Sequence, residues 1–225
     1  INNRTASAYI VTMTDANGCS IVQTTTISQP ATALTVSISK TDVSCFGGND
    51  GSATATATGG TPGYTYSLVN GTNVDVADNR SVEKYIVTAT DGNACTAEQT
   101  VTVAEPPLLV VSATATDVSC FGGNDGSATA TATGGTPGFT FLWSNGANGP
   151  TANNLSAGTY IVTATDGNAC TAEQTVTVAE PPLLVVSATA TDVSCFGGND
   201  GSATATAAGG TPALTYLWTN GANGP

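Results

Sequence analysis

Six cysteines are the residues of this chain with the most regular spacing. They alternate at intervals of about 25 and 50 residues and are Cys19, Cys45, Cys95, Cys120, Cys170 and Cys195. An even number of regularly spaced cysteines is typical of structural disulfides in an oxidising compartment. Because the chain contains no histidine, a zinc site built on these thiolates is disfavoured. We interpret all six as disulfide candidates.

Two recurring acidic loops could coordinate a cation. Residues 49–51 read Asn-Asp-Gly and residues 91–93 read Asp-Gly-Asn, with copies further along the chain. Their side-chain oxygens could hold calcium. However, the EF-hand spacing is absent, and the same residues favour tight turns. We expect no cofactor and keep calcium as the alternative.

The sequence contains few side chains that could act as catalytic groups. Without histidine the usual general base near neutral pH is missing, and the abundant Ser and Thr hydroxyls have no evident activating base. The Gly-Gly pairs are not followed by the lysine of a phosphate loop. We predict that the protein is not an enzyme.

Two tryptophans, Trp143 and Trp218, could form a stacking platform for carbohydrate. A tryptophan on the third strand of a β-sandwich more often belongs to the core. Leu68 stands at the equivalent position earlier in the chain, and a core tolerates leucine there whereas an aromatic platform does not. We predict a structural role for both tryptophans.

The charge balance excludes two classes of partner. Four cations, Arg4, Lys40, Arg80 and Lys84, face 16 acidic residues, and the net charge is −12. Nucleic acids and anionic membranes require clustered cations. No apolar run approaches the roughly 18 to 20 residues that cross a bilayer. We therefore expect no nucleic-acid partner and no membrane insertion.

The chain that carries these residues is a tandem array. The segment CFGGNDGSATATATGGTPG begins at Cys45 and recurs unchanged 75 residues later at Cys120, and a third copy begins at Cys195. Placing boundaries at the Glu-Pro-Pro motifs gives complete repeats at 31–105 and 106–180. Residues 1–30 match only the C-terminal part of a repeat, and residues 181–225 match only its N-terminal part. Either the sequence is a window on a longer array, or partial repeats of different copies complement one another.

Side-chain periodicity within a repeat is two, which predicts β-strands. In the second repeat we expect strands at 108–118, 127–133, 139–143, 151–155, 159–165 and 172–178, separated by turns rich in Gly, Asn and Asp. The predicted fold class is all-β, with tandem immunoglobulin-like β-sandwich repeats of about 75 residues. Tyr85 and Tyr160 are predicted to form tyrosine corners, in which the tyrosine hydroxyl hydrogen-bonds to the backbone. In the first repeat, Arg80 replaces Leu155 near this corner.

Three states of the cysteines remain open. Pairing within a repeat joins Cys45 to Cys95 and Cys120 to Cys170, and each bond closes a loop of about 50 residues worth roughly 4 kcal/mol. An immunoglobulin-like strand order opposes this pairing, because it separates the two positions by roughly 23 Å, whereas a disulfide needs Cα atoms about 4.4 to 6.8 Å apart. A bond across a repeat junction, Cys45 to Cys170, is the second arrangement, and free thiols are the third.

Two blocks of the sequence resemble a known family. The segments CFGGNDGSATATATGGTPGFTFLWSNG (120–146) and LSAGTYIVTATDGNACT (155–171) are similar to the SprB-type repeats of cell-surface adhesins from the Bacteroidota. The resemblance implies a very large surface filament, exported by the type IX route and used by some members in gliding motility. It also implies an extracellular location on the cell surface.

These observations favour a structural function. We expect a stalk segment of a secreted adhesin filament, with neighbouring repeats as its partners and a role in gliding motility or surface attachment. The alternative is a repeat module that binds surface polysaccharide through its loops or through Trp143.

Overall fold

The computed structural model describes residues 2–68 and 76–225. All of the regular structure in these residues is β-strand. The chain divides into two compact units, residues 1–105 and 106–225. The prediction of an all-β fold built from repeated sandwiches is confirmed.

Residues 106–180 form two three-stranded antiparallel sheets. The first has the order β12-β10-β9, and the second has the order β11-β13-β14. The strands are β9 (Val110–Thr116), β10 (Gly126–Thr133), β11 (Thr140–Trp143), β12 (Thr151–Leu155), β13 (Gly158–Thr165) and β14 (Thr171–Val178). This order is the one expected for strands A, B, E and C, F, G of an immunoglobulin-like sandwich. Thr is the commonest residue in these strands, and its β-branched side chain suits a pleated, half-buried surface.

Residues 31–105 repeat the same arrangement, with sheet orders β3-β4-β6 and β5-β7-β8. The strands are β3 (Thr35–Thr41), β4 (Gly51–Thr58), β5 (Thr65–Leu68), β6 (Val76–Arg80), β7 (Glu83–Thr90) and β8 (Thr96–Val103). Part of this predicted repeat, residues 69–75, lies outside the described residues.

The core of each repeat lies between its two sheets and consists largely of small side chains. In the second repeat, alternate alanines of β10 face the buried Trp143, Leu155 and Val162. Alternation along a strand places every second residue on the inner face. The bulk of Trp143 therefore fills space that its alanine neighbours leave.

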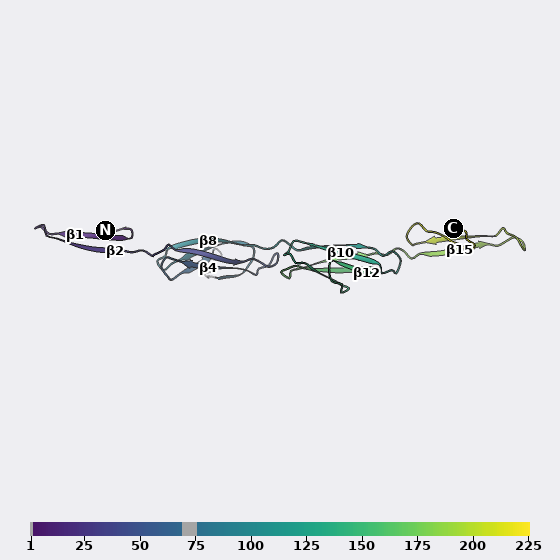
Figure 1. Ribbon diagram of the computed structural model, residues 1–225, viewed down its shortest axis with the longest axis horizontal. Helices are drawn as coiled ribbons and strands as arrows, with labels where there is room; N and C mark the ends of the chain where they lie inside the picture. Colours follow the sequence, from purple (N-terminus) through teal and green to yellow (C-terminus); the bar gives the residue numbers. More distant parts are fainter. Residues whose placement is uncertain (1, 69–75) are drawn as a thin grey trace. The chain divides into compact units, whose positions relative to one another are not determined.

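The remaining segments form two-stranded antiparallel sheets. Strands β1 (Ser7–Thr14) and β2 (Ser20–Ile27) form a hairpin in the first unit, and β15 (Val185–Thr191) pairs with β16 (Ser202–Ala208) in the second (Figure 1). Each of these segments lacks the facing sheet that a complete repeat has. Their inner faces are therefore exposed.

The described residues contain no helix that is long and apolar enough to span a membrane.

Candidate functional site

The first candidate region of each repeat is the loop after its first strand, which we call the cysteine loop (residues 42–50 and 117–125). In the second repeat the backbone N–H of Gly122 donates to Oε2 of Glu180 at 2.7 Å, and the N–H of Ser119 donates to Oδ1 of Asp125 at 3.0 Å. The first repeat has the same bond from Gly47 to Glu105 at 2.6 Å. The glutamate of the Glu-Pro-Pro motif therefore anchors the cysteine loop of its own repeat.

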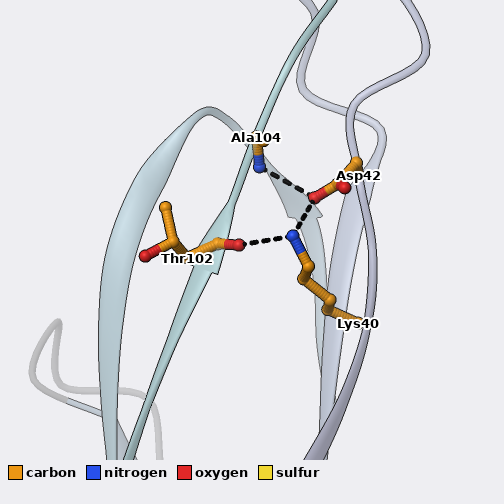
Figure 2. A network of polar contacts seen from close by, with 4 residues as sticks. All are labelled: Lys40, Asp42, Thr102 and Ala104. Atoms are coloured by element: carbon orange, nitrogen blue, oxygen red, sulfur yellow. Dashed lines mark hydrogen bonds and ion pairs between the residues drawn. The ribbon is translucent and has the colours of Figure 1, made fainter.

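A further polar network joins the cysteine loop to the last strand of the repeat. Oδ1 of Asp42 accepts hydrogen bonds from Nζ of Lys40 at 2.7 Å and from the N–H of Ala104 at 2.8 Å (Figure 2). The Lys40 ammonium also donates to the carbonyl of Thr102 at 2.8 Å. The lysine, followed by the backbone donor, lowers the pKa of Asp42.

The second repeat keeps only the aspartate of this network. Oδ1 of Asp117 accepts from the N–H of Ala179 at 2.8 Å, and Ala115 replaces the lysine. The backbone contact is thus common to both repeats, whereas the ion pair belongs to the first. Because exposed ion pairs contribute little, we assign the common role to the aspartate.

At the opposite end of the repeat lies the aspartate turn (residues 91–95 and 166–170), which connects the last two strands. Oδ1 of Asp166 accepts from the N–H groups of Asn168 and Cys170, both at 2.9 Å, and Oδ2 accepts from the N–H of Thr136 at 2.8 Å. These donors, that of Thr136 first, lower the pKa of Asp166 although burial opposes the shift. Asp91 makes the equivalent bonds in the first repeat.

The Gly-Gly pair next to the aspartate turn is required by close packing. Gly135 has a φ of +56°, and a Cβ atom there would lie 2.7 Å from Oδ2 of Asp166. Its N–H donates to the carbonyl of Pro107 at 2.8 Å. A side chain at this position would displace the carboxylate from its donors. The glycine therefore joins the aspartate turn to the start of the repeat.

The aspartate oxygens considered for calcium accept hydrogen bonds from the protein. The Asp50 carboxylate accepts from the backbone and hydroxyl of Ser44, and these bonds, the hydroxyl first, lower its pKa. Within the described ranges, no group of three or more acidic or cysteine side chains is placed to hold a metal ion. The Asn-Asp-Gly and Asp-Gly-Asn segments thus form turns in this structure.

The two tryptophans differ in exposure. Trp143 is 1% exposed, and its indole Nε1–H donates to the carbonyl of Gly149 at 3.0 Å. Trp218 makes the equivalent bond to Gly224 at 2.9 Å but is only half-buried, because no second sheet covers it. The indole of Trp143 therefore offers no face for carbohydrate stacking.

The tyrosine corners are present in the geometry expected of them. The hydroxyl of Tyr160 donates to the carbonyl of Ser156 at 3.0 Å, and that of Tyr85 donates to Ser81 at 3.2 Å. In the first repeat the guanidinium of Arg80 lies 5.7 Å from the ring centre of Tyr85. The arginine that replaces Leu155 thus packs over the ring as a cation–π contact.

The cysteines do not form the within-repeat bonds. Cys45 and Cys170 are disulfide-bonded, whereas the free thiols are Cys19, Cys95, Cys120 and Cys195. The physical reason is the separation of the cysteine loop from the aspartate turn. The loop of Cys120 contacts Glu180 after strand β14, and Cys170 precedes this eight-residue strand, which spans about 26 Å. The pairs Cys45–Cys95 and Cys120–Cys170 are therefore ruled out in this structure.

Exposed phenylalanines in the cysteine loops were not singled out from the sequence. Phe46 and Phe121 are each 52% exposed, and Phe196 of the third copy is also exposed. Their sequence signal was an aromatic residue inside a Gly-rich turn, away from any alternating run. A ligand could therefore reach these aromatic side chains.

Two β-sandwiches in tandem, with bonded turns at both ends of each, define a structural repeat protein. The family model for the SprB repeat matches residues 37–73, 112–148 and 187–223. The chain belongs to the SprB repeat family, which confirms the resemblance seen in its sequence. A search of curated proteins finds no match.

Proposed function

We propose that this chain is a stalk segment of a large cell-surface adhesin filament, located outside the cell. The observation that carries the proposal is the anchoring of both sides of the Glu-Pro-Pro linker. The side chain of Glu180 is bonded to Gly122 of the preceding repeat, and the carbonyl of Pro182 accepts from Gly210 of the following segment at 2.8 Å. Only Pro181 lies between the two anchors, and its ring restricts φ.

A short, restricted linker supports a stiff array. Flexible linkers let domains bend freely, whereas proline-rich linkers act as semi-rigid spacers. Repeats of nearly identical sequence, joined in this way, suit a spacer that carries a distal adhesive part away from the cell. Family membership supports a surface protein, and export by the type IX route and a role in gliding motility are part of the proposal.

Small-angle scattering of arrays with increasing numbers of repeats tests the stalk. We expect the maximum dimension to grow by a constant increment per repeat while the cross-section stays unchanged. Growth with the square root of repeat number is the behaviour of a flexible string, and it would contradict a stalk.

The second candidate is a repeat that binds surface polysaccharide, and the exposed Phe46 and Phe121 favour it. An aromatic face in a loop can stack on a sugar ring, whereas the buried Trp143 cannot. Glycan-array binding by the chain, lost in the triple variant Phe46→Ala, Phe121→Ala and Phe196→Ala, would favour this candidate. Retained binding in that variant would exclude these loops as the binding site.

A further inference from the structure

The segment before each tyrosine corner contains the tripeptide Asn-x-Ser or Asn-x-Thr. In the complete repeats the tripeptides are Asn154-Leu155-Ser156 and Asn79-Arg80-Ser81, and Asn3-Arg4-Thr5 stands in the same place before Tyr9. A fourth match, Asn70-Gly71-Thr72, lies outside the described residues. In an exported protein this tripeptide is the acceptor sequence for N-linked sugar.

The asparagine and the serine recur although the residues around them differ. Residues 76–84 and 151–159 agree at only three positions, which are occupied by Ala, Asn and Ser. The alanine belongs to the core and is 1% exposed in both repeats. The tyrosine corner uses the backbone carbonyl of Ser156, which any residue supplies. Core packing and the corner therefore give no reason for a hydroxyl at this position.

Asn154 occupies a β-bulge at the edge of its sheet. Strand β12 is the edge strand of the order β12-β10-β9. Leu155 lies opposite Gly126 and Asn153 lies opposite Ser127, so that no residue of β10 stands opposite Asn154 in this ladder. A bulge of this kind turns a side chain away from the regular alternation of the strand. The side chain of Asn154 is accordingly exposed.

The backbone conformation explains the asparagine but not the serine. Asn154 and Asn79 both have a φ of +56°, a left-handed conformation that asparagine adopts more readily than most residues. Ser156 is exposed, and within the described ranges neither its hydroxyl nor the Asn154 amide hydrogen-bonds to another residue. Both groups are therefore open to an enzyme while the repeat stays folded.

We propose that Asn154 and its equivalent Asn79 are N-glycosylation sites, modified by a transferase that uses a sugar activated through a diphosphate. In the transfer, Nδ2 of the asparagine forms a bond to the anomeric carbon of the sugar. The bond from that carbon to the diphosphate oxygen breaks, the diphosphate leaves with the electron pair, and one amide proton passes to a base of the transferase. The serine hydroxyl completes the recognised sequence. This inference goes beyond the stalk function and does not depend on it.

The position of the sites gives the sugar a physical effect. The outer edge of β12 presents backbone groups that could pair with a strand of another molecule, and such edges are sites of aggregation. A bulky, strongly hydrated sugar on Asn154 covers this edge. Glycosylation therefore limits edge-to-edge pairing between repeats of nearly identical sequence.

Mass spectrometry of the chain isolated from the cells that produce it tests the proposal. We expect peptic peptides to carry sugar on Asn154 and Asn79, whereas Asn153, which has no Ser or Thr two residues later, should be unmodified. A single sugar indicates transfer from a nucleotide sugar, and an oligosaccharide indicates a lipid-linked donor. Unmodified Asn154 and Asn79 in peptides that cover both positions would overturn the proposal, as would equal modification of Asn153.

Matched variants made in the same cells separate the acceptor sequence from the fold. Ser156→Ala keeps the asparagine and the carbonyl of the corner and should lose all sugar at Asn154, whereas Ser156→Thr should keep it. Asn154→Gly removes the acceptor nitrogen but suits the positive φ, so its circular dichroism should match that of the parent. Asn79 should stay modified in all three variants. Sugar retained on Asn154 in the Ser156→Ala variant would refute recognition of this sequence.

Discussion

The carboxylate of Glu180 accepts a 2.7 Å hydrogen bond from the backbone N–H of Gly122, a residue 58 positions earlier in the chain. Glu105 makes the same contact with Gly47 across the same sequence separation. The contact closes the end of the sandwich at which the linker begins. It couples the conformation of the cysteine loop to the position of the linker.

Removing this contact should loosen the cysteine loop without unfolding the repeat. For Glu180→Ala we expect a loss of about 1 kcal/mol, the usual net value of a hydrogen bond, and faster amide exchange at Gly122. Glu173→Ala is the control, because its carboxylate accepts a hydrogen bond from the Thr163 hydroxyl on the outer face of the sheet. Equal exchange at Gly122 in both variants would show that Glu180 does not hold the loop.

The prolines of the linker should stiffen the array. We expect the simultaneous replacement of Pro106, Pro107, Pro181 and Pro182 by glycine to leave each sandwich folded, because no core residue changes. Bending of the array should increase because φ is released and backbone donors return. Small-angle scattering measures the effect, and an unchanged maximum dimension and cross-section would show that the prolines do not stiffen the array.

The core role of Trp143 predicts a large cost for its removal. Trp143→Ala should destabilise the second repeat by about 3 to 5 kcal/mol, the range for large aromatic side chains in cores. Trp218→Ala should cost much less, because that side chain is only half-buried. Hydrogen exchange of the strands of residues 106–180 in increasing urea provides the measurement. Similar costs for the two variants would contradict the burial difference.

The aspartate turns predict loss of stability in acid. The folded-state pKa values of Asp91 and Asp166 are lowered, chiefly by the N–H donors of Thr61 and Thr136. The unfolded chain therefore binds more protons than the folded chain once the pH falls to about 3.9, the ordinary aspartate value. Stability should be constant between neutral pH and about pH 5 and should fall as the pH drops through 3.9 toward the folded-state values.

Asp166→Asn provides the matched test of this acid dependence. The variant keeps the shape of the side chain but loses the charge, so it should melt at a lower temperature at pH 7 and show a shallower acid dependence. Circular dichroism melting curves at each pH measure both effects. An acid dependence as steep as that of the parent would show that Asp166 does not contribute.

The thiol states predict a distinct labelling pattern. Alkylation of the denatured, unreduced protein should label Cys19, Cys95, Cys120 and Cys195 and should spare Cys45 and Cys170. Because the chain has no lysine or arginine after Lys84, pepsin rather than trypsin must supply the peptides for mass spectrometry. A peptide pair joined through Cys120 and Cys170 would contradict the separation between the cysteine loop and the aspartate turn.

Strand positions could be predicted from the sequence because they depend on the alternation of inward-facing and outward-facing residues along each strand. The run at 151–155 coincides with β12, and the other strands of the second repeat differ from their predicted bounds by at most two residues at either end. Gly-rich turns limit each run, so the period of two has clear ends. The hydrogen bond from the Tyr160 hydroxyl to a carbonyl four residues away could also be predicted, because its two partners are close together in the sequence.

The sequence by itself determined the repeat period, the alternating strands and the family of this chain, because identity between copies and a period of two can be recognised by comparing residues along the chain, without knowing how it folds. Only the tertiary structure decided that Glu180 holds the loop at Gly122, that Asp166 gathers three backbone donors and that Cys120, unlike Cys170, is a free thiol. These relationships join residues that are tens of positions apart or depend on the direction of a side chain. They arise when two sheets pack face to face and bring loops at the same end of the sandwich into contact, which no local pattern encodes.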